Sequence, residues 1–457
     1  MDRLIRGGRV VTPQRTFPAD VLIREGKIAA VGENLPADGC AVYDAAGCLL
    51  FPGFIDAHTH LDMSNGVTTT ADNFATGTAA AVCGGTTTLL DFATQDRGDT
   101  LAHALDAWHE KADGNCSCDY GFHMAIVDWN PAVSAEVAQM VEAGVTSFKL
   151  YMAYDNLRVS DGQIYEILKR VGEFHGIIGV HCENGDLVNE LVDEYRRAGK
   201  LSPYYHPLSR PDFVEAEAVA RYCYLARAAG VPVNIVHLST RLGLEEARRA
   251  RARGQKVYIE TCPQYLTLDD GVYDRGFESA KFVCSPPIRK KSDQDALWGA
   301  IAAGEVDTIS TDHCSFNMAG QKELGREDFS KIPNGMPGLE HRPAAVYTAG
   351  VAAGRMTENQ MAALLSENTA RLFGMYPRKG VITPGADADL VVWDPAARWT
   401  VTAQNQHHNC DNTPYEGMEM QGRAKAVFLH GEQAVEDGEL IAAGLGRYVA
   451  RGESEYL

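Results

Sequence analysis

Short apolar runs alternate with helix-like stretches through the middle of the chain. Eight runs rich in β-branched and aromatic residues lie at 54–59, 86–92, 120–128, 145–151, 177–181, 233–238, 256–261 and 306–311. Stretches with helical periodicity separate them, for example 132–142, 161–175, 213–229, 241–253 and 293–303. Alternating strands and helices imply a parallel sheet, and eight such units over about three hundred residues predict a (β/α)8 TIM barrel of the α/β class.

The two ends of the chain have a different pattern, with short strand-like runs broken by Gly and Pro. Such runs fill residues 1–52, and the same style returns over 381–435. We interpret them as two parts of one small β-sandwich, because chain termini often lie close together. The expected organisation is a sandwich part over 1–52, the barrel over 53–376, and the second sandwich part with a tail over 377–457.

Composition narrows the possible partners. The 457 residues carry a formal net charge of −19 and contain no run rich in Lys or Arg, so nucleic-acid binding is not expected. No apolar run is long enough to span a membrane, and no apolar segment of a signal peptide follows the N-terminal residues. The 11 cysteines are odd in number and include no CxxC pair, which disfavours disulfides and zinc ligation and favours a reducing cytoplasm.

Potential metal ligands follow the predicted strands. His58 and His60 end the first strand, and residues two apart on a strand share a face. His181, His237 and Asp312 each follow a later apolar run. Active sites of TIM barrels lie at the C-terminal ends of the strands, so these side chains should meet there. Imidazole and carboxylate ligands suit Zn, Mn, Fe or Co better than Mg or Ca.

Lys149 ends the fourth predicted strand and is unexpected among such ligands, because an ammonium repels a divalent cation. One explanation is an ion pair between Lys149 and Asp312. The other is reaction with CO2, which turns the amine into a carbamate whose two oxygens could bridge two cations. The sequence leaves both explanations open.

Several segments together resemble one enzyme family. They are 58–63 (HTHLDM), 84–88 (GGTTT), 147–149 (SFK), 284–287 (CSPP) and 334–335 (NG). Over essentially its full length the chain resembles the cyclic amidohydrolases, in particular the dihydropyrimidinase and D-hydantoinase branch with its aryl-hydantoinase members. The resemblance implies two divalent metal ions, expected to be zinc, bound by His58, His60, carboxylated Lys149 (N6-carboxylysine), His181, His237 and Asp312.

The resemblance also implies a reaction and a homotetramer. Tyr154, Ser285 and Asn334 would bind the ring of a small cyclic ureide, and Tyr154 would donate to the developing oxyanion. Asp312 would be both metal ligand and proton shuttle. The expected reaction opens 5-substituted hydantoins or 5,6-dihydropyrimidines to N-carbamoyl amino acids. Apolar substituents would contact the strand-end loops through Met63, Val67, Phe92, Tyr151, Met152 and Leu157.

Three alternatives remain. Dihydroorotase-like enzymes carry an arginine shortly after the two histidines, whereas residues 61–66 contain no cation, although Arg97 or Arg158 could turn into the site. Allantoinase fits less well by motif. A non-catalytic scaffold of the same fold would have lost metal ligands, whereas all six ligand positions are filled here. His313 stands where many relatives carry glutamine, and its side chain should point away from the site.

Overall fold

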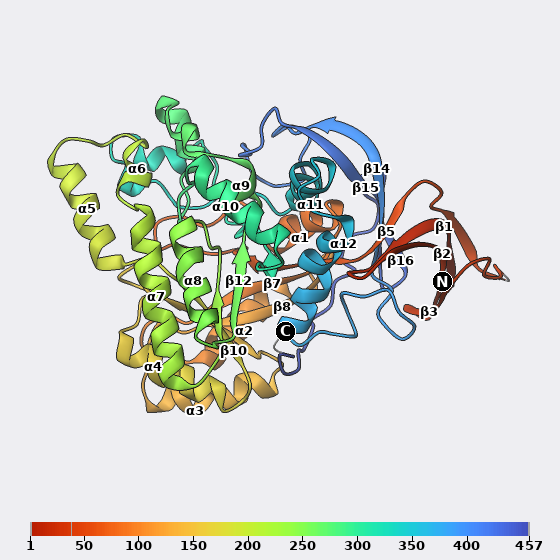
Figure 1. Ribbon diagram of the computed structural model, residues 1–457, viewed down its shortest axis with the longest axis horizontal. Coiled ribbons are helices and arrows are strands. Elements are labelled where there is room, and N and C mark those ends of the chain that lie inside the picture. The colour runs from red at the N-terminus through yellow and green to blue at the C-terminus, as the bar shows by residue number, and fades with distance from the viewer. Residues whose placement is uncertain (1, 38, 456–457) are drawn as a thin grey trace.

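The structure, a computed structural model, describes residues 2–37 and 39–455. Strands from both ends of the chain form one nine-stranded sheet, seen at the right of Figure 1. Its path runs β17-β16-β15-β14-β5-β1-β2-β3, with β4 paired to β1. The strands are β1 (Arg3–Val11), β2 (Thr16–Arg24), β3 (Lys27–Gly32), β4 (Ala41–Asp44), β5 (Leu49–Pro52), β14 (Leu390–Thr400), β15 (Glu419–Leu429), β16 (Glu432–Glu436) and β17 (Glu439–Leu440).

The two ends of the chain share one apolar core within this sheet. Ile5 and Val21 from the N-terminal strands pack with Leu390, Val392 and Phe428 from the C-terminal strands. β5 and β14 pair antiparallel and so join the two parts through backbone hydrogen bonds. The expected sandwich built from both ends of the chain is therefore confirmed.

The middle of the chain forms an eight-stranded sheet in the order of the sequence, and all its strand pairs are parallel. The strands are β6 (Phe54–Thr59), β7 (Thr86–Thr94), β8 (Asp119–Ala125), β9 (Ser147–Tyr151), β10 (Ile177–His181), β11 (Val233–Ile235), β12 (Val257–Thr261) and β13 (Thr308–Ile309). A parallel bridge between Thr59 and His313 joins the last strand region to the first. The predicted (β/α)8 barrel is confirmed.

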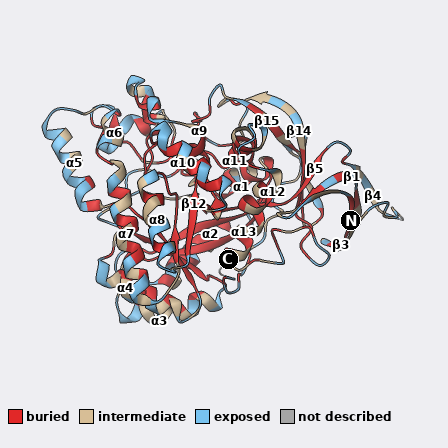
Figure 2. Ribbon diagram, viewed as in Figure 1, coloured by how far each residue is buried: buried red, intermediate tan, exposed pale blue. Residues whose placement is uncertain are grey.

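Helices surround the barrel, with buried inner faces and exposed outer faces (Figure 2). The helices are α1 (Phe74–Cys83), α2 (Leu101–Ala112), α3 (Pro131–Glu142), α4 (Asp161–Gly172), α5 (Gly185–Arg197), α6 (Tyr205–Leu208), α7 (Asp212–Ala229), α8 (Arg241–Ala252), α9 (Pro263–Thr267), α10 (Lys291–Ala302), α11 (Arg342–Val346), α12 (Glu358–Ala362) and α13 (Asn368–Leu372). Asn130, Ser160 and Thr240 cap the N-termini of α3, α4 and α8, where free backbone N–H groups need acceptors. These caps fix where each helix begins after its strand-end loop.

The barrel strands are buried on both faces, as expected where helices cover a parallel sheet. None of the 11 cysteines forms a disulfide, and all but the partly exposed Cys40 are buried, which agrees with their interpretation as small core residues. Within the described residues, no helix combines the length and the apolar character that crossing a membrane requires.

Candidate functional site

Histidines and an aspartate from the two ends of the barrel sheet meet at its C-terminal mouth. His58 lies near the end of β6 and His60 follows it, while Asp312 follows β13. Oδ1 of Asp312 lies 3.2 Å from Nε2 of His58 and 3.2 Å from Nε2 of His60. One ligand atom from each of the three residues lies within 4.8 Å of the others, which is close enough for them to hold one metal ion.

A second pair of histidines lies beside this group. His181 ends β10 and His237 follows β11. Nδ1 of His181 lies 3.0 Å from Nε2 of His237, and the ring centres of His58 and His237 are 5.3 Å apart. Both pairs of imidazoles therefore belong to one continuous cluster at the mouth of the barrel.

Two buried glutamates fix which nitrogen of these histidines is free to bind a cation. Nδ1 of His58 lies 2.7 Å from Oε1 of Glu260, and Nε2 of His181 lies 2.9 Å from Oε2 of Glu183. Each carboxylate needs a donor, so the proton of each ring faces its glutamate. The unprotonated nitrogens, Nε2 of His58 and Nδ1 of His181, then face the centre of the cluster.

Lys149 lies inside the same cluster on β9. Its Nζ is 3.4 Å from Nε2 of His58, and the side chain is fully buried. Burial lowers its pKa to about 8. Burial and then Lys149 lower the pKa of His58, which leaves that ring neutral and able to act as a ligand. The cluster thus brings together all six ligand positions expected from the sequence.

Three candidate site residues have left-handed backbone conformations that non-glycine residues rarely adopt. The φ angles are 68° at Tyr154, 40° at His237 and 54° at Asp312. Such strain persists only where the surrounding structure imposes it, and it gathers at functional sites. The barrel therefore holds these three residues in strained conformations, at a cost in folding free energy, and this fixes the direction of their side chains.

The three expected substrate-binding residues also face the site region. Tyr154 lies in the loop after β9, and its ring centre is 5.1 Å from that of His181. Burial raises the pKa of Tyr154 despite the nearby Arg210, so its hydroxyl keeps the proton and can donate. Oγ of Ser285 and Oδ1 of Asn334 are buried; Ser285 interacts with the hydroxyl of Tyr154, and Oδ1 of Asn334 makes no hydrogen bond within the described part of the chain. Unpartnered buried polar atoms are what a ligand-binding site leaves for its ligand.

Comparison with known proteins identifies this arrangement. The sequence profile of the Amidohydrolase family matches residues 49–434, which is most of the chain. The chain belongs to the amidohydrolase family.

Relatives of this amidohydrolase match it along the whole chain. A D-hydantoinase from Geobacillus stearothermophilus is 44% identical over 99% of this chain and 97% of its own. A D-phenylhydantoinase from Escherichia coli O81 (strain ED1a) is 40% identical over 98% of both. Among solved structures, dihydropyrimidinase from Brevibacillus agri NCHU1002 superposes with a TM-score of 0.98 at 43% identity and 99% coverage of both chains.

Two arginines that could have entered the site of this amidohydrolase are engaged outside it. Arg97 donates to the carbonyls of Asp155, Asn156 and Arg158, at 3.2, 3.1 and 2.9 Å, so it braces the loop that carries Tyr154. Arg158 pairs with Asp155 and Asp186, at 2.9 and 2.6 Å. Neither guanidinium is available as the counter-ion of a substrate carboxylate in this conformation.

The predicted apolar contacts divide into two groups. Phe92, Tyr151 and Met152 are buried, and Phe92 stacks between His60 and His123 with ring centres 4.9 and 4.8 Å away. Phe92 therefore packs against histidines of the cluster, contrary to the expectation that it contacts a substituent. Met63, Val67 and Leu157 remain accessible on the strand-end loops, with Val67 78% exposed.

His313 points away from the ligand cluster, as expected for the neighbour of Asp312. Its Nδ1 accepts from the backbone of Gly338 at 3.1 Å, and its Nε2 lies 3.2 Å from Asp72. The residues missed from the sequence are Glu183 and Glu260, which orient the ligands. A glutamate inside the apolar run 256–261 was the available signal for Glu260, and Glu183 follows His181 by two residues, just after β10 ends.

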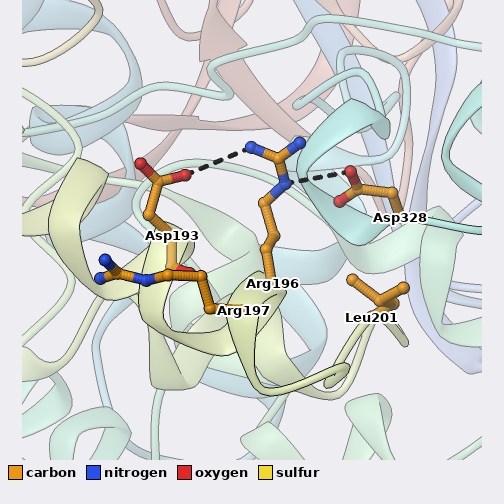
Figure 3. Close-up of a pocket in the computed structure, with 5 residues that line it drawn as sticks. All are labelled: Asp193, Arg196, Arg197, Leu201 and Asp328. Atoms are coloured by element: carbon orange, nitrogen blue, oxygen red, sulfur yellow. Dashed lines mark hydrogen bonds and ion pairs between the residues drawn. The ribbon is translucent and has the colours of Figure 1, made fainter.

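Two other groups of charged residues lie in the described part of this amidohydrolase, and neighbouring charges compensate both. Asp119, Asp387 and His430 come close enough to bind a cation, but Lys379 already occupies their centre, 3.1 Å from Asp387 and 2.6 Å from Asp389. A surface cavity of about 490 Å³ at the end of α5 is lined by Asp193, Arg196, Arg197, Leu201 and Asp328 (Figure 3). There Arg196 bridges the two aspartates at 3.2 Å each, so the charges are compensated (Figure 3).

Proposed function

We propose that this protein opens the cyclic amide bond of 5-substituted hydantoins and of 5,6-dihydropyrimidines, releasing N-carbamoyl amino acids. The names of the full-length relatives support this substrate class. The observation that carries the proposal is the orientation of His58 and His181, whose glutamate partners leave the ring nitrogens facing a common centre.

We propose two divalent metal ions, zinc in the first place, at this centre. The donor set fits them, because four imidazoles, one carboxylate and Lys149 exceed what one tetrahedral ion requires. His58, His60, His181, His237 and Asp312 would hold the ions. When bound, the ions would lower the pKa of a coordinated water and polarise the substrate carbonyl.

Lys149 is the proposed site of carboxylation, and its carbamate would supply an anionic ligand for the ions. Its lowered pKa increases the fraction of neutral amine, which can attack CO2 and release a proton to form the carbamate. The alternative is an ion pair with Asp312, whose charge acts against burial on the pKa of Lys149, but no carboxylate forms a salt bridge with Lys149 among the described residues. A carbamate anion would remove the repulsion that an ammonium exerts on bound cations.

The proposed proton path uses Asp312 and Tyr154. Burial opposes the charge of Asp312, but its contacts with His58 and His60 lower its pKa overall, so the carboxylate would be ionised and able to accept a proton from the attacking water. It then returns that proton to the leaving nitrogen. The Tyr154 hydroxyl donates to the oxygen that gains negative charge as the carbonyl becomes tetrahedral.

Ser285 and Asn334 bind the ring in this proposal. The hydroxyl of Ser285 and the amide oxygen of Asn334 match the C=O and N–H groups that a cyclic ureide presents. Met63, Val67 and Leu157 remain for contact with an apolar substituent, and burial of apolar area is worth about 25 cal/mol per Å². A substrate carboxylate would lose its solvation without gaining a cation, because Arg97 and Arg158 are already engaged.

Kinetics with 5-phenylhydantoin, dihydrouracil, allantoin and dihydroorotate tests the substrate class. The expected result is a higher kcat/KM for the first two than for the last two. A higher kcat/KM for allantoin or dihydroorotate than for both others would overturn the assignment, and absence of all turnover together with absence of stoichiometric metal would favour a scaffold.

We propose a preference for the D-enantiomer of 5-substituted hydantoins. D-hydantoinases from Geobacillus stearothermophilus and Streptomyces coelicolor are 44% and 45% identical to this chain, whereas the L-hydantoinase from Arthrobacter aurescens is 28% identical. Parallel assays of D- and L-5-benzylhydantoin test this, and faster turnover of the L-form would contradict it.

We also propose domain boundaries, a homotetrameric assembly and a cytoplasmic location. The sandwich parts cover 1–52 and 377–457 and the catalytic barrel covers 53–376, because β5 ends at Pro52 and β6 begins at Phe54. A homotetramer rests on analogy with the family, and light scattering tests it. The free cysteines favour a reducing cytoplasm.

A further inference from the structure

Lys322 is a buried lysine that has no role in the proposed reaction. It begins a short 3-10 helix (Lys322–Gly325), and its side chain is completely inaccessible to solvent. No carboxylate forms an ion pair with it among the described residues. Burial lowers its pKa to about 8. Burying a lysine here costs free energy, because its ammonium loses its hydration. An apolar side chain would avoid that cost.

The ammonium of Lys322 is held by three backbone carbonyls. Nζ donates to the oxygens of Val283, Pro333 and Gly335, at 2.9, 2.7 and 2.7 Å. These three bonds use all the donors that an ammonium offers. Hydrogen bonds from a charged donor are stronger than those between neutral groups, so this one side chain ties three backbone positions firmly together.

The three carbonyls belong to the two segments that carry the proposed ring-binding residues. Val283 lies two residues before Ser285, while Pro333 and Gly335 flank Asn334 on both sides. A backbone hydrogen bond from Gly335 to Val283, 2.9 Å long, runs directly between the same segments. Ser285 and Asn334 are distant in sequence, and Lys322 is a side chain that contacts the backbone around both.

The junction leaves little freedom for either segment. A Cβ atom at Gly335 would lie 2.3 Å from the carbonyl oxygen of Cys314, and φ at Gly335 is 147°, which favours glycine. On the other segment, Nε2 of His206 holds the carbonyl of Cys284 at 2.7 Å, and the hydroxyl of Tyr265 donates to that of Pro286 at 2.7 Å. Lys322 is a third side chain that holds these backbone carbonyls. Unlike His206 and Tyr265, it contacts both segments.

We propose that Lys322 is a positioning residue for substrate specificity: its ammonium sets the spacing of Ser285 and Asn334, so that both meet the ring of one substrate. This inference rests on the proposed role of those two residues in the hydrolysis of cyclic ureides. Misplacement by about 1 Å is enough to cost a large factor in an enzyme reaction. Lys322 does not contact the metal ligands, so its loss should weaken substrate binding and leave metal binding intact.

The test compares Lys322→Met, which removes all three donors at similar length, with Lys322→Gln, which keeps two. Lys331→Met is the matched control, because Lys331 is exposed and lies nine residues further along the chain. Each metal-replete variant is assayed for metal content, thermal stability, and kcat and KM for 5-phenylhydantoin. The expected result is a KM at least about tenfold higher in Lys322→Met, a smaller rise in Lys322→Gln, normal metal content in both, and no change in the control.

A purely structural role would lower the active fraction of the enzyme, and hence apparent kcat, at unchanged KM; that outcome overturns the proposal. A double-mutant cycle sharpens the test, since Lys322→Met should add little to the KM of Asn334→Ala if Lys322 acts through Asn334. Fully additive effects would contradict it.

A crystal structure of Lys322→Met tests the positioning role without relying on an activity measurement. It therefore gives an answer even if turnover is too low to assay, and it distinguishes failure of this inference from failure of the proposed function. Displacement of Ser285 relative to Asn334 would support the positioning role even if wild-type enzyme fails to open hydantoins. Unmoved segments would overturn the positioning role even if it succeeds.

Discussion

Nζ of Lys149 lies 3.4 Å from Nε2 of His58, within the buried cluster of histidines and without a salt bridge to a carboxylate among the described residues. An ammonium beside that nitrogen would oppose cation binding. The proximity is therefore explained if the working enzyme carries a carbamate on this nitrogen.

We expect Lys149→Ala to lose most of its bound metal and its activity, because the anionic ligand is gone. Short carboxylic acids such as acetate or propionate should restore part of both by occupying the vacated space. Elemental analysis and turnover, with and without added acid, provide the measurement. Wild-type protein should hold about two divalent ions per chain; less than half an ion per chain in active wild-type protein would sink this proposal.

Asp312→Asn should reduce kcat by at least the 10²–10⁴-fold that general acid–base catalysis typically contributes. The amide keeps the size of the side chain but cannot accept the proton of the attacking water. Circular dichroism should show an unchanged fold. Near-normal kcat in this variant would mean that another group carries the proton.

Lys379→Met should destabilise the folded state by roughly 3–5 kcal/mol, because it leaves buried carboxylates without a cation to pair with. Lys379 binds Asp119 at the start of β8 and Asp387 and Asp389 before β14, so the barrel and the terminal sheet both depend on it. Denaturant unfolding measures the change. Lys27→Met is the control, since Lys27 pairs with the same Asp387 but is half exposed, and a surface pair is worth about 0–1 kcal/mol. Equal losses in the two variants would contradict the explanation.

Stability should depend on pH through Glu340 and His407, which pair at 2.9 Å. Hydrogen bonds to Cys83 and Glu340 raise the pKa of His407 to about 11, so its contribution is complete below the ordinary value of 6.5 and is lost as pH rises toward 11. Burial opposes the charge of Glu340, but the bond from His407 and nearby histidines lower its pKa to about 2. Its contribution is complete above 4.5 and is lost as pH falls toward 2.

The pair should therefore stabilise the protein most between pH 4.5 and 6.5. The difference in Tm between wild type and His407→Gln, measured by calorimetry, should be greatest in that window and should shrink steadily at alkaline pH. A difference that is independent of pH would show that the pair does not carry this linkage.

The barrel strands and the ligand positions could be predicted because both rest on local patterns. Each apolar run is buried on both faces, and His58, His181 and Asp312 lie where such a run ends, which places them at one mouth of any parallel barrel. The resemblance to a family supplied Tyr154, Ser285 and Asn334 as ring-binding candidates.

Contacts between distant segments could not be predicted in the same way. Glu260 is separated from His58 by 202 positions, and nothing local to Lys322 indicates that it binds the carbonyl of Val283. Phe92 follows the pattern of a loop contact, but the fold places its ring between two histidines. Such roles depend on which elements become neighbours, and that is decided by the closure of the whole barrel.

The pairing of Leu50 on β5 with Val392 on β14 has a consequence for synthesis on the ribosome. About 340 residues separate these partners, which at about 5–20 residues per second corresponds to roughly 20–70 s of translation. Throughout that interval one edge of β5 has no strand to bind, and an unpaired edge is open to pairing with other chains. The first strands of the nascent protein therefore keep an edge open to pairing with other chains until the last part of the chain has been synthesised.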